Sequence, residues 1–184
     1  IQTMKAYLQM GQYEKLSQYL SELEVDLNTV DTVIKTGNVV IDAILNSKIS
    51  LAKHQDIQVK AKAIVPADLG NSISEVDLSI ILGNLMDNAI EACQQIPDKK
   101  DRFIRVYIDI LKGQLYLYIM NSSCQKLMRT GKIYRTTKNE KYHGFGLLRV
   151  DKMVEKYEGY LNRQDEEGVF ATEVMLPLID TIRA

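Results

Sequence analysis

Two asparagines spaced four residues apart form the clearest chemical pattern in this chain of 184 residues. Asn84 and Asn88 lie in the stretch "LSIILGNLMDNAIEACQQ". On a helix, that spacing brings their two amide oxygens side by side. Neutral, hard oxygens suit a Mg²⁺ ion that also bridges phosphate groups. The pair therefore indicates a metal and nucleotide site, although ordinary solvated helix faces also carry such pairs.

A second pattern, "HGFGLL", begins at His143. Gly144 and Gly146 would let a phosphate group approach the backbone closely, and the helix that starts there presents free amide groups and the positive end of its dipole. A glycine-containing loop before a helix is also a common structural feature. The order of the two patterns, with a hairpin and a basic segment between them, favours one phosphate site built from both.

The helix that carries the asparagines needs an apolar side to anchor it. Ser74 and Asp77 form a capping box at its start, and we expect it to end before Pro97. Asn84 and Asn88 lie opposite one apolar stripe. That stripe is formed by Leu78, Leu82, Leu85, Met86, Ala89 and Cys93.

Alternating apolar residues predict strands on both sides of this helix. Residues 57–65 alternate before it. Residues 104–110 and 115–119 alternate after it and are joined by a "KG" turn, which predicts an antiparallel hairpin. A last hairpin, "YLNRQ" and "VFATEVMLPL", closes the chain.

Residues 121–143 show neither a helical nor a strand period, and we expect a long basic loop there. Loops of this length inside a domain usually act as lids or binding loops. The next stretch, "GFGLLRVDKMVEKYEG", predicts a helix that stops at Gly159. The basic residues of the loop recur at every third position: Lys126, Arg129, Lys132, Arg135, Lys138 and Lys141.

Residues 1–54 predict a helical hairpin that is half of a dimeric four-helix bundle, because two helices alone bury little apolar surface. Residues 55–184 predict a two-layer α/β sandwich with a mixed sheet, so the fold class is α+β. The first helix is expected to end near Asn28. The second is outlined by Val40, Ala43, Ile44, Ser47 and Leu51.

Composition excludes several classes of function. The net charge of −1 gives no basic field for nucleic acid, and no apolar run approaches the roughly 20 residues of a membrane span. Cys93 and Cys124 are too few for a disulfide framework, which favours reduced thiols and a cytoplasmic location. Ile1 is not a start methionine and no signal peptide follows, so we expect a piece of a longer protein.

Together these motifs resemble the ATP-binding domain of sensor histidine kinases, in the GHKL superfamily that includes DNA gyrase and MutL. "NLMDNAIEA" resembles the N box and "GFGL" the second glycine box, within a match over residues 57–178. The AgrC-like quorum-sensing kinases are the most similar group. The resemblance implies ATP and Mg²⁺ as cofactors, with the metal at Asn84 and Asn88. It implies ATP contacts from Asn84, Asn88, Asn121, Lys138, Gly144, Gly146 and Leu147.

Two departures from the family pattern bear on chemistry. Most kinases have Asp-x-Gly-x-Gly after the hairpin, whereas this chain reads "MNSSCQ", with Asn121 at the aspartate position. An amide oxygen still accepts a hydrogen bond from the adenine amino group, but more weakly than a carboxylate. ATPases of the superfamily place a glutamate where Asn84 stands, and an amide is not a base. Transfer to a protein side chain, not hydrolysis, is therefore expected.

The resemblance further implies a homodimer that transfers the ATP γ-phosphate to a histidine for relay to a response regulator. His54 and His143 do not match the family's acceptor motif, so we expect the acceptor before Ile1, in a membrane-anchored protein whose cytoplasmic portion this is. The alternative is a dimeric phosphotransfer or scaffold protein with a degenerate kinase fold and no ATP chemistry. The missing aspartate box motivates that alternative.

Overall fold

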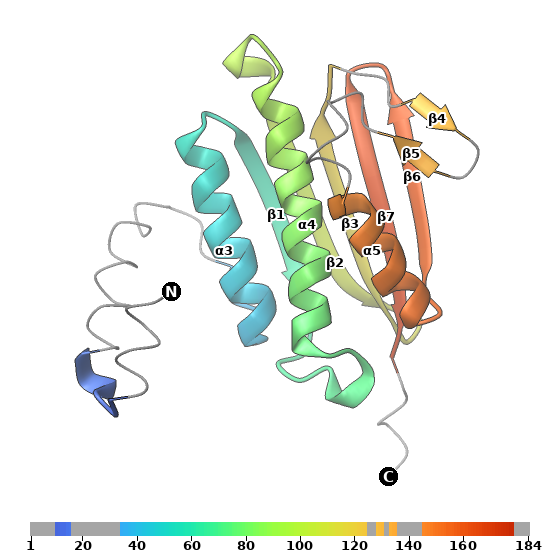
Figure 1. The fold of residues 1–184 in the computed structure, drawn as a ribbon. Helices are drawn as coiled ribbons and strands as arrows, with labels where there is room; N and C mark the ends of the chain where they lie inside the picture. Colours follow the sequence, from blue (N-terminus) through green and yellow to red (C-terminus); the bar gives the residue numbers. More distant parts are fainter. Residues whose placement is uncertain (1–9, 16–33, 125–127, 131–132, 136–144, 179–184) are drawn as a thin grey trace. The chain divides into compact units, whose positions relative to one another are not determined.

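The computed structural model describes residues 10–15, 34–124, 128–130, 133–135 and 145–178. The chain divides into two compact units, Ile1–Val33 and Ile34–Ala184, and the second holds the labelled helices and strands (Figure 1). The first predicted helix falls mostly outside the described residues. The helical hairpin and its dimeric bundle therefore stay predictions.

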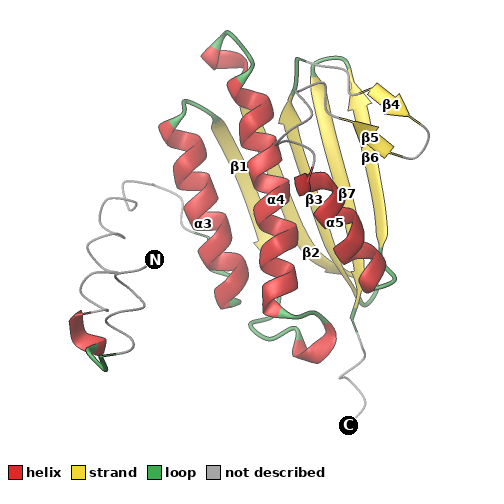
Figure 2. Ribbon diagram, in the orientation of Figure 1, coloured by secondary structure: helices red, strands yellow, loops and turns green. Residues whose placement is uncertain are grey.

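The second unit is a mixed sheet with helices on one face, which confirms the α+β prediction for this part of the chain (Figures 1 and 2). The strand order is β1-β2-β3-β7-β6, where β1 runs parallel to β2 and the other neighbours are antiparallel. The elements are α3 (Val39–His54), β1 (Gln58–Ile64), α4 (Glu75–Gln94), β2 (Phe103–Leu111), β3 (Gln114–Ser122), β4 (Met128–Thr130), β5 (Ile133–Arg135), α5 (Phe145–Lys156), β6 (Tyr160–Glu166) and β7 (Val169–Pro177), with 3-10 turns at Gly70–Ser72 and Lys99–Asp101.

The strands form where the period-two pattern predicts them, and their inward residues make the core. Lys112 and Gly113 join β2 to β3 with positive φ angles of 52° and 74°, which is the geometry of a two-residue hairpin turn. The buried inward residues of the central strands are Ile104, Val106, Ile108, Leu115, Leu117, Ile119, Val174 and Leu176.

The central helix α4 also follows its prediction. The side chain of Ser74 accepts a hydrogen bond from the backbone N–H of Asp77, and the helix ends at Gln94, before Pro97. The predicted apolar stripe is buried along its whole length. Its polar side, with Asn84 and Asn88, is therefore held in a fixed direction relative to the sheet.

Helix α3 corrects one prediction, the apolar face of the second helix. The predicted face included Ala43, Ser47 and Leu51, and these three are exposed. α3 packs against α4 and β1 and belongs to the unit that starts at Ile34. Apolar residues lie on several sides of this helix, so only its neighbours decide which side is buried. The buried residues are Ile41, Leu45, Ile49, Ser50 and Ala52.

An ion pair adds to this packing and accounts for an acidic residue between the two asparagines. Lys48 Nζ of α3 lies 2.5 Å from Asp87 Oδ1 of α4. Asp87 therefore points toward α3, away from the side of α4 that carries Asn84 and Asn88.

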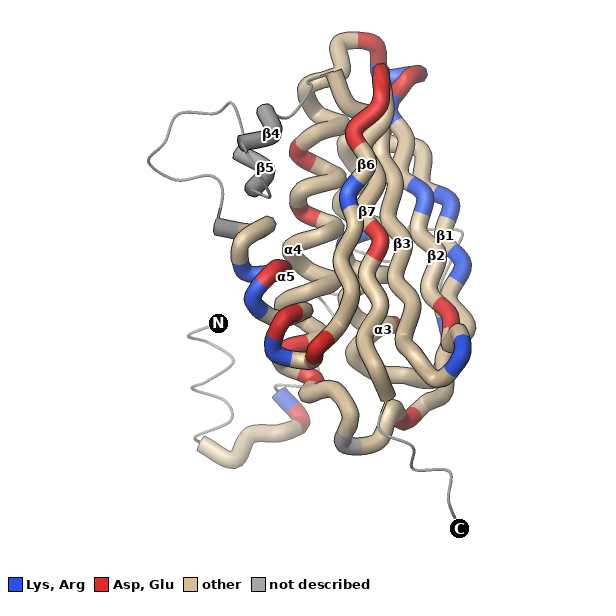
Figure 3. The backbone as a smooth tube through the Cα atoms, turned by 90° about the vertical axis from the view of Figure 1, so that its right-hand side faces the viewer, with Lys and Arg blue, Asp and Glu red and all other residues tan. Residues whose placement is uncertain are grey.

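Helices α3, α4 and α5 lie on one face of the sheet, and Figure 3 shows the two layers from the side, with basic positions along β1 and β2. Lys60, Lys62 and Arg105 are exposed. Inside the predicted basic loop, the structure describes the two-stranded sheet of β4 and β5, which the sequence did not indicate. No described helix is long and apolar enough to cross a membrane.

A cluster of polar side chains ties the start of α4 to the end of α5. Asp77 is 8% exposed, and its Oδ2 accepts hydrogen bonds from Lys156 Nζ at 2.6 Å and Tyr157 OH at 2.5 Å. The Tyr157 hydroxyl in turn accepts from the backbone N–H of Ser74 at 3.0 Å. The Lys156 hydrogen bond, followed by that of Tyr157, holds the pKa of the Asp77 carboxyl below its usual value.

We expect Asp77→Asn to lower the free energy of unfolding at neutral pH by about 1 kcal/mol, since solvent screens the half-exposed Lys156. A carboxyl with a lowered pKa stabilises the fold above its ordinary pKa and loses that contribution as the pH falls through the folded-state pKa. Urea unfolding between pH 7 and pH 3 should therefore show the two proteins converging at acid pH. Glu75→Gln, an exposed carboxylate in the same helix turn, serves as the control. A constant difference across this range would contradict the ion-pair account.

Candidate functional site

Asn84 and Asn88 lie directly against the first turn of α5. A Cβ atom built on Gly146 would stand 3.1 Å from Asn84 Oδ1 and 3.4 Å from Asn88 Oδ1. Both amide oxygens therefore converge on the place where the backbone of α5 begins. Residues separated by more than fifty positions in the sequence meet there because α4 and α5 pack side by side.

The two amides are not equivalent. Asn84 Nδ2 donates to the backbone carbonyl of Ile80 at 2.6 Å, which turns its Oδ1 toward α5. Asn88 Nδ2 is buried and has no hydrogen-bond partner among the residues that the structure describes. A buried donor without a partner costs free energy, so Asn88 Nδ2 is a candidate donor to a bound group.

A pocket opens beside Asn88, between α4, the sheet and the start of α5. Asn121, at the end of β3, is 3% exposed, and its Nδ2 donates to the carbonyl of Ser122 at 2.9 Å. This hydrogen bond leaves Oδ1 as the acceptor for a ligand. The pocket is lined by Leu85, Asn88, Ala89, Ile119, Asn121, Leu147, Phe170 and Thr172.

The structure thus brings together five of the residues singled out from the sequence. They are Asn84, Asn88, Asn121, Gly146 and Leu147. Lys138 and Gly144 lie outside the described residues, so their expected contacts with ATP remain predictions.

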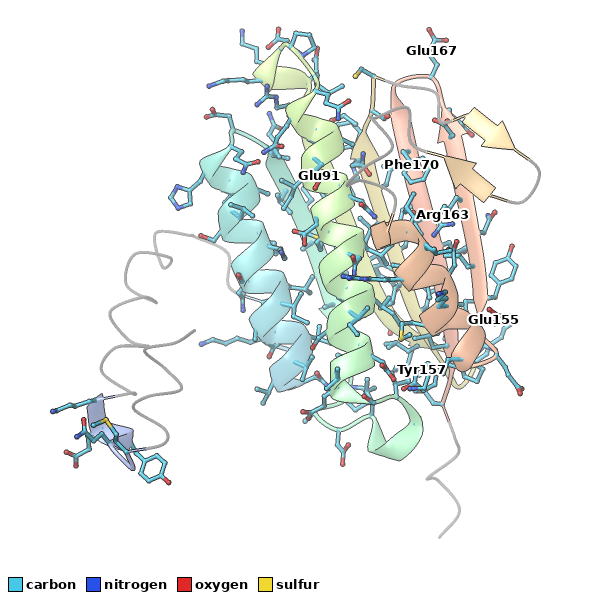
Figure 4. All side chains as sticks on the ribbon, viewed as in Figure 1. Glu91, Glu155, Tyr157, Arg163, Glu167 and Phe170 are labelled. Atoms are coloured by element: carbon cyan, nitrogen blue, oxygen red, sulfur yellow. The ribbon has the colours of Figure 1, made fainter. Side chains whose placement is uncertain are left out.

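Sequence reasoning missed Phe170 and Thr172, which β7 contributes to the pocket. Thr172 is 4% exposed and lies in the same inward row as Val174 and Leu176. A polar residue in an otherwise apolar inward row is the signal that could have found it, since a buried hydroxyl needs a partner. Figure 4 shows Phe170 near the start of α5.

A protein-family model described as the GHKL domain matches residues 73–177, more than half of the chain and all of the elements just described from α4 to β7. The chain belongs to the GHKL domain family. A curated protein named "Probable C4-dicarboxylate sensor kinase", from Halalkalibacterium halodurans, is 25% identical over 187 aligned positions. The alignment covers 96% of this chain and 35% of that relative, so the chain spans about a third of the relative's length.

Solved structures show the same fold. The catalytic domain of histidine kinase ThkA matches with a TM-score of 0.59 at 14% identity, covering 78% of this chain and 93% of that one. The histidine kinase AdeS of Acinetobacter baumannii matches with a TM-score of 0.55 at 12% identity, covering 93% of this chain and 82% of that one. The fold of this GHKL domain is therefore that of histidine kinase catalytic domains.

The site of this GHKL domain fits a magnesium nucleotide. Two hard amide oxygens converge at Gly146, a position without a side chain, and the unpartnered Nδ2 of Asn88 lies beside them. The N-terminus of α5 adds free backbone amides. Next to this polar corner, the small pocket between Asn121 and Thr172 is lined by apolar walls and one acceptor, the kind of lining that nucleobase sites use.

Gly146→Ala is expected to weaken ATP binding to the GHKL domain by about tenfold, because the added methyl group must displace the Asn84 amide or shift α5 by a few tenths of an ångström. Gly83→Ala is the matched control. Gly83 precedes Asn84 on α4, and a Cβ there meets nothing within 4 Å. This control should bind ATP normally and gain about 0.5–1 kcal/mol of stability. Calorimetric titration of both variants checks the prediction, and equal affinities would contradict it.

Proposed function

We propose that this chain is the ATP-binding catalytic part of a sensor histidine kinase, which transfers the γ-phosphate of ATP to a histidine for relay to a response regulator. The observation that supports this most directly is the contact of Gly146 with the amides of Asn84 and Asn88 beside the pocket of Asn121. A polar corner that could hold phosphates, next to a pocket with an acceptor for a base, is what supports the proposal. The curated relative, named a probable sensor kinase, agrees with the proposal.

Each residue has a distinct part in this proposal. The oxygens of Asn84 and Asn88 would hold Mg²⁺, and the metal would supply positive charge against the phosphate oxygens. The backbone at Gly146 and the N-terminus of α5 orient the triphosphate. Oδ1 of Asn121 accepts a hydrogen bond from the adenine amino group, and Leu147 covers the nucleotide from the side of α5.

Phosphoryl transfer is favoured over hydrolysis by the chemistry of position 84. Asn84 Nδ2 is engaged with Ile80, and its amide oxygen has no useful basicity, so this residue does not activate water. His54 lies exposed in the last turn of α3, and His143 lies outside the described residues. We propose that the acceptor is another histidine, in the full-length protein.

The decisive experiment is a calorimetric titration of the chain with ATP in the presence and absence of Mg²⁺, with GTP as the competitor nucleotide. We expect Mg²⁺-dependent binding of ATP and much weaker binding of GTP, whose base presents a carbonyl to the Oδ1 of Asn121. The alternative of a scaffold with a degenerate kinase fold predicts no binding of either nucleotide. That result would overturn the proposal.

Partners and location follow from the same proposal. We propose a homodimer formed by the N-terminal helices, a response regulator as the protein partner, and a cytoplasmic position in a membrane-anchored sensor. The AgrC-like resemblance favours a peptide signal, whereas the name of the curated relative favours a C4-dicarboxylate. To distinguish the peptide signal from the C4-dicarboxylate signal, the full-length kinase is exposed to each one. The rate of phosphate transfer to candidate response regulators is then measured.

A further inference from the structure

Arg163 is a buried cation that lies next to the nucleotide site without lining its pocket. It occupies an inward position of β6 and pairs in register with Thr172 of β7, which does line the pocket. Its side chain is only 5% exposed. The inward position two residues earlier on the same strand is occupied by Leu161, so an apolar residue would satisfy the packing on this side of the sheet.

The contacts of Arg163 lead to the first two turns of α5. Its Nη2 donates to the backbone carbonyl of Leu147 at 3.4 Å and lies 2.5 Å from Asp151 Oδ1. In Figure 4, Arg163 lies beside the start of α5, whereas Tyr157 lies at the other end. Arg163 therefore attaches to the sheet the same turn that places Gly146 against the asparagines.

Packing alone would not favour an arginine at position 163, because the electrostatic surroundings of a charged side chain there are unfavourable. A guanidinium beside the N-terminal part of a helix faces the positive end of the helix dipole. Taking a charge out of water adds a further penalty, which an ion pair offsets only in part. Asp151 supplies that ion pair, but its side chain is 39% exposed. The positive end of the α5 dipole disfavours the guanidinium of Arg163. An anion bound at the start of α5 would be stabilised by both positive charges.

We propose that Arg163 is a positioning residue for the phosphate part of the nucleotide site, an inference that rests on the proposed ATP-binding function. By holding Leu147 and Asp151, it keeps the first turn of α5 in place, so that Gly146 stays close to Asn84 and Asn88. It acts through the backbone of α5 and is not among the residues that line the base pocket of Asn121. The affinity for phosphates should therefore depend on Arg163 much more strongly than the affinity for the nucleoside.

Arg163→Met tests this, because methionine fills a similar volume without a charge or a donor. Calorimetric titrations with Mg²⁺-ATP and with adenosine are compared for the wild type and the variant. We expect the ATP affinity to fall by about tenfold or more, as for residues that orient a ligand group indirectly. The adenosine affinity should stay within about twofold of the wild-type value.

Lys156→Met is the matched control, since it removes the ion pair with Asp77 at the other end of the same helix. It should leave the affinities for ATP and adenosine unchanged while lowering the melting temperature. Arg163→Lys keeps the positive charge but loses the planar guanidinium with its paired donors, and should lower the affinity for ATP by severalfold. It also serves if Arg163→Met does not fold.

Three outcomes would overturn the inference. They are unchanged ATP affinity in the Arg163 variants, an equal loss for ATP and adenosine, and an equal loss of ATP affinity in Lys156→Met. A wild-type chain that binds neither ATP nor adenosine would instead remove the proposed function, and the inference with it.

Discussion

Replacing Asn88 by alanine is expected to lower the affinity for Mg²⁺-ATP by at least about 100-fold, because the change removes one of the two amide oxygens that we propose as metal ligands. The same change removes the buried Nδ2 that has no partner among the described residues. The free chain should therefore lose little stability. Titrations with and without Mg²⁺ measure the effect, which should be far smaller without the metal.

Ser79→Ala is a suitable control for Asn88→Ala. Ser79 lies on the same helix, is only partly exposed and donates its hydroxyl to the backbone carbonyl of Glu75 at 2.7 Å, away from the site. It should bind Mg²⁺-ATP as the wild type does. Equal affinities for the wild type and Asn88→Ala would remove the metal assignment from Asn88. Asn84→Asp, which keeps an oxygen but adds a charge, then shows whether the neighbouring position holds the metal alone.

The largest expected effect on stability is that of Gly159→Ala, about 3 kcal/mol in the free energy of unfolding. A Cβ atom on Gly159 would lie 2.5 Å from the backbone carbonyl oxygen of Met175 and 2.8 Å from a methyl group of Leu176. A backbone oxygen at that distance has no freedom to give way, so α5 or β7 must shift. Chemical denaturation followed by circular dichroism measures the loss.

Gly113→Ala separates the clash from a general cost of replacing glycine. Gly113 has a φ of 74°, and a Cβ there meets nothing within 4 Å, so only backbone strain opposes the change. That strain is worth about 1–2 kcal/mol. If Gly159→Ala is no more destabilising than Gly113→Ala, the close approach of β7 to Gly159 is not what requires a glycine there.

Gly159 also shows how a correct prediction can rest on an incomplete reason. The sequence indicated that α5 stops at Gly159, as helices often do at glycine. In the structure, the residue with a left-handed conformation is Glu158, at a φ of 51°. Gly159 is needed because β7 passes too close for any side chain. Local sequence carries no information about a strand that arrives from elsewhere in the chain.

The sequence by itself determined most of the elements and half of the site. Period-two alternation defined the strands, and a single apolar stripe left only one way to bury α4, so the direction of Asn84 and Asn88 followed. The turn at Lys112 and Gly113 likewise depends on neighbouring residues only. These features are local, or are set by one unambiguous periodicity, and such patterns survive in any tertiary context.

The tertiary structure alone decided which surfaces meet. α3 offers apolar residues on several sides, and its contact with α4 and β1 selected Ile41, Leu45 and Ile49. The pairing of β3 with β7 placed Phe170 opposite Asn121, and α5 brought Gly146 onto the two asparagine amides. The burial of Arg163 follows from the position of β6 beneath α5. Each of these contacts joins segments far apart in the chain, so its free energy depends on packing that no local pattern encodes.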